Sequence, residues 1–335
     1  EPFTPDVVAE RCGISADAIR QIAREFSEAS GAAIHARIGT CTQEFGTLSS
    51  WLPDVIHYAT GNLDRVGGAM FPLASHGGAT TKGKPGVGHG LRFGRHTSRV
   101  SGHPEILGEL PAACLAEEIE TEGEGQIRML FVIAGNPLLS TVNTERLTRA
   151  IEGLEFMVSL DIYVNETSRH ADVILPGLSP LEVPHFDPAF AQLAIQNHAR
   201  YSPPVFDKPE DQPYEWETLL RLTGLVSGQG SDADVAALDD YVLLNAIERE
   251  AKPETSAIHG CDPRPILAQL APRRGVERMV DFMLRTGPYG DGFGKDEDGL
   301  TLDQLEAHPH GIPFGALKPR IPEALRTPSG KIELA

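Results

Sequence analysis

The chain has 335 residues, of which 41% are hydrophobic and 23% are charged, a composition typical of a folded globular protein. Its formal net charge of −18 excludes general binding to nucleic acid or to anionic membranes, since both require a positive surface. No apolar run approaches the roughly 20 residues that cross a bilayer, so we expect no membrane insertion.

The start of the chain, Glu1-Pro2-Phe3-Thr4, carries neither an initiator Met nor the basic and apolar segments of a signal peptide. We therefore expect a piece of a longer polypeptide and assign it to the cytoplasm. The four cysteines lie far apart in the sequence without a CxxC pair. Zinc and iron–sulfur sites normally use closely spaced thiolates, so we expect free thiols in a reducing compartment.

The first predicted elements are helical. Ser15 is a suitable N-cap for a helix with apolar residues at helical spacing, ended by Gly31, and a second helix is predicted over 48–59. The short apolar run 32–34 between them predicts a strand. We interpret residues 1–72 as the C-terminal part of one Rossmann-like domain.

Residues 73–125 are predicted to form a Gly-rich basic loop and a connecting helix over 111–120. The loop is basic because it holds several cations and no acid: Lys82, Lys84, Arg92, Arg95 and Arg99. Its run Gly86–Gly90 follows no strand, so it is not a dinucleotide-binding fingerprint. Two interpretations stay open, contact with phosphates or an anionic substrate, and a solvated surface loop. We expect residues 82–99 to be poorly ordered, or held by non-native contacts, in the isolated chain, because ordering glycines is costly and the phosphates that could pair with the cations are absent.

Residues 126–205 predict a β-α-β unit. Strands are expected over 127–134, 156–160 and 173–175, and Asn143 can cap a helix between the first two. Strands that are apolar throughout indicate a parallel sheet with helices on both faces. The fold class is therefore α/β with two Rossmann-like portions, followed by a mostly helical segment over 206–326.

Ligands of open parallel sheets collect at the carboxyl ends of the strands. The turn 135–141 lies there, where helix N-terminal amides favour phosphate and where Asn136, Ser140 or Thr141 can add hydrogen bonds. The alternative is an ordinary capped turn. Asp161 ends the next strand, where its carboxylate could hold a ribose hydroxyl of NAD or the two N–H donors of guanine. The alternative for Asp161 is a cap for a helix over 165–170.

Three segments, in order, resemble one family. They are 39–68, 159–176 (SLDIYVNETSRHADVILP) and 327–334 (TPSGKIEL). The family is that of the molybdopterin-guanine-dinucleotide oxidoreductases, the dimethyl sulfoxide reductase superfamily, with formate dehydrogenases and nitrate reductases among its members. By this resemblance, residues 327–335 would begin a C-terminal barrel domain.

The resemblance implies a bis-molybdopterin guanine dinucleotide cofactor that carries molybdenum or tungsten. Gly39 and Gln43 would lie near the pterin, Asn136 would contact the nucleotide, and Leu160 and Asp161 would contact guanine. A further residue, Asn165, stands where the family has a guanine-binding Thr.

In that family a 4Fe-4S cluster and the metal ligand lie upstream of the matching region. We therefore expect no catalytic or metal-binding residue in this chain. Its main partner would be the remainder of its own polypeptide, and the isolated piece would be inactive and free of metal. The redox partner and the substrate stay open.

The chain also departs from the family. The Arg-Gly-Gln segment of formate dehydrogenases is replaced by Leu73–His76, and a Glu- and Arg-containing pattern is lost over 181–200. Two alternatives follow: a metal-free scaffold like the large iron–sulfur subunit of NADH dehydrogenase, and an NAD-binding dehydrogenase domain. Retention of Gln43, Asn136 and Asp161 disfavours the scaffold, and the lack of a GxGxxG after a strand disfavours the dehydrogenase.

Overall fold

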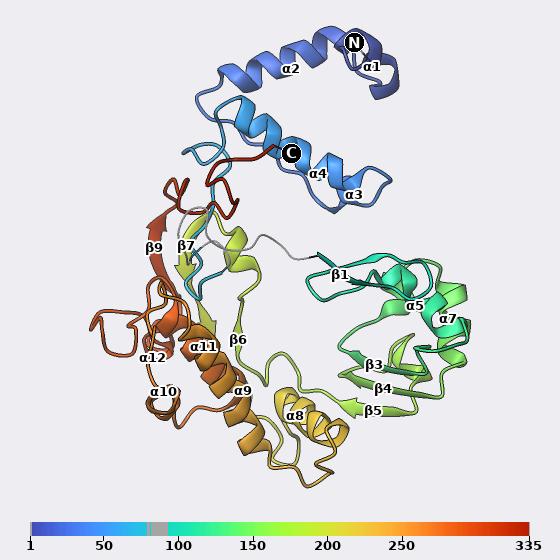
Figure 1. Cartoon of the computed structure of the whole chain (residues 1–335), viewed down its shortest axis with the longest axis vertical. Helices are drawn as coiled ribbons and strands as arrows, with labels where there is room; N and C mark the ends of the chain where they lie inside the picture. The colour runs from blue at the N-terminus through green and yellow to red at the C-terminus, as the bar shows by residue number, and fades with distance from the viewer. Residues whose placement is uncertain (1, 79–80, 82–92, 335) are drawn as a thin grey trace.

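The structure is a computed structural model that describes residues 2–78, 81 and 93–334. Figure 1 shows three parts: a group of N-terminal helices, a small sheet flanked by helices, and a larger helical region with short strands. No helix among the described residues is both long and apolar enough to span a membrane.

Four helices form the N-terminal part: α1 (Pro5–Cys12), α2 (Ala16–Glu28), α3 (Ile38–Cys41) and α4 (Gly46–Ala59). Ser15 caps α2 as predicted, because its hydroxyl accepts a hydrogen bond from the Ala18 amide at 3.2 Å. The predicted second helix is confirmed as α4. The helices α1, α2 and α3 bury no residue, and α4 buries only Gly46 and His57.

The strand predicted over 32–34 is wrong. The amide of Ile34 donates to Nε2 of His57 at 2.8 Å, so a side chain takes the place that a neighbouring strand would occupy. Between residues 2 and 72, the described chain has one isolated bridge, Leu63 with Ala69, and no strand. The Rossmann-like sheet expected for this part is therefore not formed by these residues.

Part of the basic segment is well structured. Lys82, Lys84, Arg92 and the run 86–90 lie outside the described residues. From residue 93 onward, β1 (Phe93–Thr97) pairs with β2 (Pro104–Ile106) in an antiparallel hairpin. Arg95 bonds to Glu105, and Arg99 donates to the carbonyls of Glu118 and Thr121 at 3.3 and 2.6 Å. The prediction of poor order is wrong for 93–99, because acids and carbonyls from later in the sequence satisfy its cations.

The predicted β-α-β unit is confirmed. It comprises η1 (Ala112–Cys114), α5 (Leu115–Glu120), β3 (Met129–Ile133), α6 (Pro137–Ser140), α7 (Thr144–Glu152), β4 (Phe156–Asp161), η2 (Ser168–His170) and β5 (Val173–Pro176). The three strands form a parallel sheet in the order β3-β4-β5. Asn143 caps α7, since its side chain accepts from the Arg146 amide at 3.3 Å.

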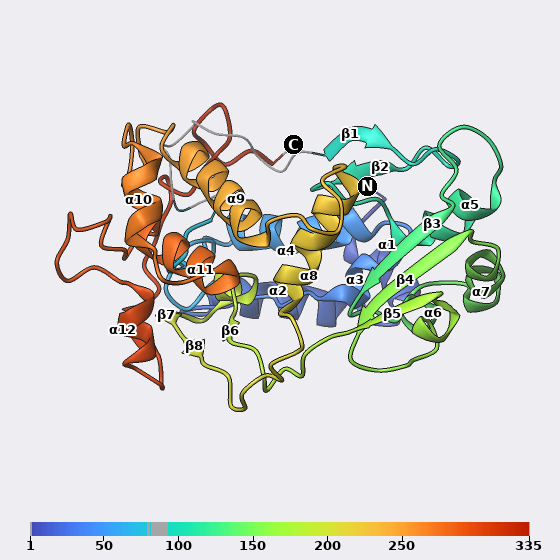
Figure 2. The ribbon, with the colours of Figure 1, turned by 90° about the horizontal axis from the view of Figure 1, so that it is seen from below.

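Helices cover one face of this sheet rather than both. Figure 2 shows α5, α6 and α7 grouped on one side of the three strands. Their apolar residues form one core with the sheet, from Ala116, Ile119, Val132, Leu138, Leu147, Ala150, Ile151 and Met157. On the opposite face Met129, Ile133, Phe156 and Val173 remain between 39% and 55% exposed. This second face is therefore covered only in part, since Val158 and Leu160 on it are 7% and 1% exposed, and the helices α5, α6 and α7 pack on the other face.

The region after the sheet is mostly helical, as predicted. Its helices are α8 (Glu215–Val226), α9 (Val235–Glu250), α10 (Pro263–Gln269), α11 (Gly275–Thr286) and α12 (Leu302–Glu306). Short strands accompany them: β6 (His185–Phe186), β7 (Gln196–Ala199), β8 (Tyr201–Ser202) and β9 (Ile312–Ala316), with the 3-10 turn η3 (Phe190–Leu193). Antiparallel pairing joins β6 to β8, and β7 to β9, which the sequence did not predict.

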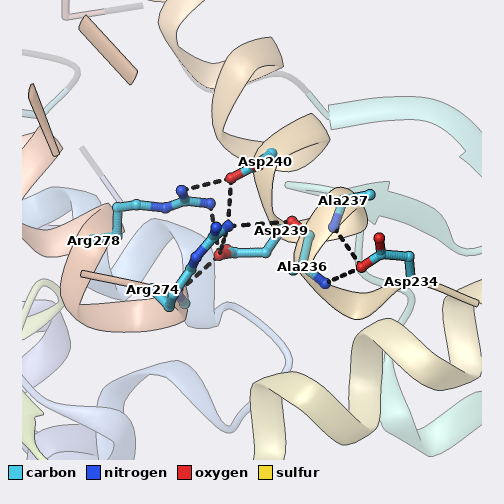
Figure 3. Close-up of polar contacts among 8 residues, drawn as sticks. Asp234, Ala236, Ala237, Asp239, Asp240, Arg274 and Arg278 are labelled. Carbon is cyan, nitrogen blue, oxygen red and sulfur yellow. Dashed lines mark hydrogen bonds and ion pairs between the residues drawn. The ribbon is translucent and has the colours of Figure 1, made fainter. Parts of the chain in front are cut away.

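A buried charge cluster joins α9 to α11 (Figure 3). Arg278, only 3% exposed, donates to Asp239 at 2.6 Å and to Asp240 at 2.7 Å. Arg274 also bonds to Asp240 at 2.6 Å. At the start of α11, a Cβ on Gly275 would lie 2.3 Å from the Trp216 ring, and φ is +56° there, so a side chain could not fit.

The end of the chain returns to the N-terminal part. The carboxylate of Asp64, 8% exposed, accepts from the amides of Arg320 at 2.6 Å and Ile321 at 2.5 Å. Residues 327–334 form turns and no strand, so a barrel domain beginning there stays a prediction.

Candidate functional site

The carboxyl ends of β3, β4 and β5 meet at one edge of the sheet. Parallel pairing places Ile133 beside Leu160, and Asp161 beside Pro176. The amide of Ala134 donates to the Leu160 carbonyl at 2.8 Å, and that of Gly177 donates to the Asp161 carbonyl at 3.1 Å. The strand ends thus hold 134–136, 160–161 and 176–177 together.

Asn136 has its side chain fully engaged at this edge. Its Nδ2 donates to Glu166 at 2.7 Å, and its Oδ1 accepts from the Thr167 hydroxyl at 2.7 Å. The hydrogen bond from Asn136 lowers the pKa of Glu166, which keeps that carboxyl negatively charged. Asn136 therefore serves first to hold the 165–168 turn against the end of β3.

The start of α6 has no free amide for a phosphate. Pro137 has no N–H, the Leu138 amide donates to the Thr167 hydroxyl at 3.1 Å, and the next two amides donate to the Asn136 carbonyl at 3.0 Å. The hydroxyls of Ser140 and Thr141 donate to carbonyls one turn earlier in the chain. Within the turn 135–141, the amides of Gly135 and Asn136 have no acceptor among the described residues, so the phosphate interpretation of this turn stays a prediction that concerns these two amides.

Asp161 is 9% exposed, and its carboxylate is held by two donors. Its Oδ1 accepts from the Tyr163 amide, and its Oδ2 accepts from Nδ2 of Asn165, both at 3.0 Å. Each carboxylate oxygen has a second lone pair, so each can accept one more hydrogen bond. The arrangement fixes the carboxylate while leaving acceptor capacity on both oxygens.

The alternative role of Asp161 as a helix cap is not formed, because its carboxylate accepts from the Tyr163 amide and the Asn165 side chain and from no amide of 165–170. The Oδ1 of Asn165 accepts from the amides of Thr167 and Ser168, both at 2.9 Å. Asn165 thus caps the turn with one side-chain atom and orients Asp161 with the other.

The other predicted residues lie differently. Leu160 is 1% exposed, so its side chain is buried and does not face a ligand-accessible surface. Gln43 is exposed and bonded within its own segment, to the Ser49 hydroxyl at 2.7 Å and the Phe45 amide at 2.9 Å. Gly39 lies on α3, which Figure 1 shows well apart from the β3-β4-β5 sheet. The structure therefore gathers Asn136, Asp161 and Asn165, with Leu160 beneath them, and places Gly39 and Gln43 elsewhere.

Sequence reasoning missed several residues at this edge. Thr167 and Glu166 hold Asn136, and Gln212 donates to the carbonyls of Pro176 and Gly177 at 3.1 and 3.0 Å. Thr167 could have been suspected, because it lies in the conspicuous polar run after β4. Gln212 sits in a Pro-rich stretch with no signal of its own. Among the described residues there is no group of three or more His, Cys, Asp or Glu placed to hold a metal.

Comparison with known families gives the class of protein. The family model "Molybdopterin oxidoreductase" matches residues 18–208, which is more than half of the chain. The match includes the sheet and its carboxyl edge. The chain belongs to the molybdopterin oxidoreductase family.

Individual relatives match over part of their length. The chain is 28% identical over 196 residues to the assimilatory nitrate reductase catalytic subunit of Bacillus subtilis, covering 52% of this chain and 26% of the relative. It is 27% identical over 188 residues to formate dehydrogenase H of Escherichia coli, covering 53% of this chain and 26% of that relative. It spans about a quarter of the length of these relatives.

A solved structure supports the fold. Acetylene hydratase from Pelobacter acetylenicus superposes with a TM-score of 0.60 at 16% identity, over 98% of this chain and 42% of the other. At this identity the likeness concerns the fold alone. Together with the family match, it places the chain as one portion of the fold that its larger relative adopts.

Proposed function

We propose that this chain supplies a guanine-binding edge of a molybdopterin-dependent oxidoreductase. The observation that carries the proposal is the carboxylate of Asp161, fixed at the end of β4 by Tyr163 and Asn165 with one open lone pair on each oxygen. Family membership supports molybdopterin as the class of cofactor, and its guanine dinucleotide form is part of this proposal.

The chemistry of guanine fits this carboxylate. The base presents a ring N–H and an exocyclic amino group side by side, and two carboxylate oxygens can accept from both in a charge-assisted, bidentate contact. Adenine presents no such pair of donors. Asn165 is a positioning residue in this scheme, because its amide holds Asp161 and closes the neighbouring turn.

The phosphates of such a nucleotide would approach the amides of Gly135 and Asn136. Those amides end β3 without an acceptor among the described residues, whereas the start of α6 is occupied. The charged Glu166 accepts from the Asn136 side chain and would repel a phosphate from that side-chain amide. In this proposal the nucleotide would lie across the ends of β3 and β4.

The bound metal of the cofactor would exchange an oxygen atom or a hydride equivalent with a substrate. This chain's share is to hold and orient the nucleotide. The second nucleotide, the metal ligand and a 4Fe-4S cluster would belong to the rest of the polypeptide, and the chain alone would be inactive.

The test is Asp161→Asn in the full-length protein. The substitution keeps the shape, removes the charge and turns one acceptor toward guanine into a donor. A charge-assisted hydrogen bond contributes about 1.5–3 kcal/mol, so affinity should fall at least about tenfold. We expect the content of released GMP and of molybdenum or tungsten to fall together, with an unchanged circular dichroism spectrum.

A matched control is Asp172→Asn. Asp172 also accepts a backbone amide, that of Met157 at 2.7 Å, but it precedes β5 at the opposite end of the sheet. This variant should keep its GMP and metal content. Full occupancy in Asp161→Asn would reject the site.

A further inference from the structure

A cavity lies away from the sheet edge. It has a volume of about 520 Å³ and is enclosed by Ser75, β6, the segment from η3 to β7, and β8. Figure 1 shows β6 and β7 in the other half of the molecule from β3, β4 and β5. The cavity is within the size range of small-molecule sites.

One wall of this cavity is formed by the strand segment 198–202, whose alternate residues point in opposite directions. Alternate residues 199 and 201 are 3% exposed and belong to an apolar core with α11 and α12. The residues between them, His198, Arg200 and Ser202, therefore point the other way and line the cavity. His185 lies directly opposite Ser202 in the β6–β8 pair and joins the same face.

Ser75 contributes a buried donor without a partner. The residue is 0% exposed, and its Oγ has no hydrogen-bond partner among the described residues. Its backbone is fixed, because its carbonyl packs so closely on Gly287 that a Cβ there would lie 1.9 Å from it. Leaving a hydroxyl buried and unpaired costs free energy, and a ligand that accepts from it would remove that cost.

The charge of the cavity favours an anion. No ion pair is formed by Arg200 with any described residue, and His185 and His198 have no acidic partner. The one acid in the wall, Asp187, already accepts from the amides of Ala189 at 3.0 Å and Phe190 at 2.8 Å. Both of these bonds go to Oδ1 of Asp187, whereas the guanidinium of Arg200 has no acidic partner among the described residues and is available to an anion.

We propose that this cavity binds a small organic anion with a phosphate or carboxylate head group. The guanidinium of Arg200 and the Ser75 hydroxyl hold the head group, and Phe186 and Phe190 contact the apolar body of the ligand. The site goes beyond the guanine-binding edge and does not depend on it. No residue is shared between the two.

The experiment titrates the chain with phenyl phosphate, inorganic phosphate and benzoate by isothermal calorimetry. We expect saturable binding of phenyl phosphate, benzoate or both, and weaker binding of inorganic phosphate, which lacks the ring. Arg200→Gln should weaken binding at least about tenfold, as expected for loss of a charge-assisted hydrogen bond. Arg221→Gln, an exposed arginine of α8 outside the cavity, should bind as the unaltered chain does.

Ser75→Ala tests whether the Ser75 hydroxyl binds the ligand or is only buried in the protein. The variant should fold with unchanged or higher thermal stability, because an unpaired hydroxyl is removed. It should also bind the anion several-fold more weakly. Unchanged affinity in Ser75→Ala or in Arg200→Gln would overturn the proposal, as would failure of all three probes to saturate. Asp161→Asn should not affect this binding, so the two sites can fail independently.

Discussion

The N-terminal helices and the C-terminal helices form equally regular secondary structure but differ in what their apolar faces contact. The helix α2 has 13 residues and buries none of them, and its Ile22 is 58% exposed. In α9, by contrast, Leu243 and Ile247 are 2% and 0% exposed. Helix periodicity and capping are local properties, whereas burial requires a partner surface. Of these two regions, the described chain supplies that partner only in the C-terminal one.

The C-terminal helices have cores of their own. One contains Leu243, Ile247, Ile258, Ile266, Leu270 and Phe282, and a second joins α11 and α12 to the strand segment 199–201. Burial of this kind makes unfolding cooperative, while helices without it fray on their own. We therefore expect substitutions in the C-terminal region to change global stability, and equivalent substitutions in the N-terminal helices to act locally.

The largest effect is expected for Arg278→Met. This removes the buried cation between α9 and α11 and leaves Asp239, 6% exposed, with weaker partners. Breaking a buried ion pair from one side costs about 3–5 kcal/mol, which urea unfolding would measure. Arg274→Met is the control, because Arg274 is 45% exposed and its loss should cost about 1 kcal/mol or less. Equal losses would show that the cluster is not a buried unit.

A matched pair of apolar substitutions tests the comparison directly. Ile247→Ala should lower the free energy of unfolding by about 2–5 kcal/mol, because it opens a cavity in a filled core. Ile22→Ala should change it by less than about 0.5 kcal/mol, because Ile22 is already exposed to water. A large loss for Ile22→Ala in this chain would mean that α2 has a partner surface after all.

The same distinction explains which parts of the fold were predictable. Helices α2, α4, α8 and α9 follow from periodicity and from local caps such as Ser15, and the apolar runs of β3 and β4 are long enough to read as strands. The false strand at 32–34 is equally apolar, but its amide bonds to His57 from a distant helix. The pairing of β9 with β7 joins residues more than 100 positions apart, and no local pattern encodes it.

At the candidate site, the sequence predicted where residues lie along the strands, but not which groups they form hydrogen bonds with. Asp161 lies at the end of its strand as expected, because strand boundaries follow from the apolar run. The occupation of the α6 amides by Thr167 could not be predicted, since it depends on how the turn after β4 folds back. The unpartnered hydroxyl of Ser75 has no sequence signal, because an unpaired state is a property of its surroundings.

The β1–β2 hairpin is held by the buried carboxylate of Glu105 and should respond to acid. The hydrogen bond from Arg95, with the amides of Gly108 and Arg95, lowers the pKa of Glu105 to about 2. The unfolded value is about 4.3, so the stabilising contribution is fully present above that pH and is lost as the pH falls toward 2. Titration of the Glu105 carboxyl carbon by NMR would show the midpoint.

Glu105→Gln should abolish this acid sensitivity of the β1–β2 hairpin. The amides of β1 should then exchange with solvent at rates that vary less between pH 4.3 and pH 2, after correction for intrinsic exchange, than in the unaltered chain. A midpoint near the ordinary glutamate value would show that Arg95 does not hold the carboxylate in solution.

The smallest expected effect on stability comes from removing two helix caps. It distinguishes the N-terminal helices from the C-terminal helices, because each group contains one of the caps. Ser15 caps α2 through the Ala18 amide, and Asp234 caps α9 through the amides of Ala236 and Ala237 at 2.9 and 3.1 Å (Figure 3). Replacing either cap by Ala costs about 1 kcal/mol of helix stability. Because α9 is part of a buried core, Asp234→Ala should lower the global unfolding free energy by that amount in urea. Because α2 buries nothing, Ser15→Ala should leave the global transition unchanged and speed hydrogen exchange of α2 amides roughly fivefold, the equivalent of about 1 kcal/mol. A shift of the global midpoint in Ser15→Ala equal to that in Asp234→Ala would show that the two helical regions unfold as one.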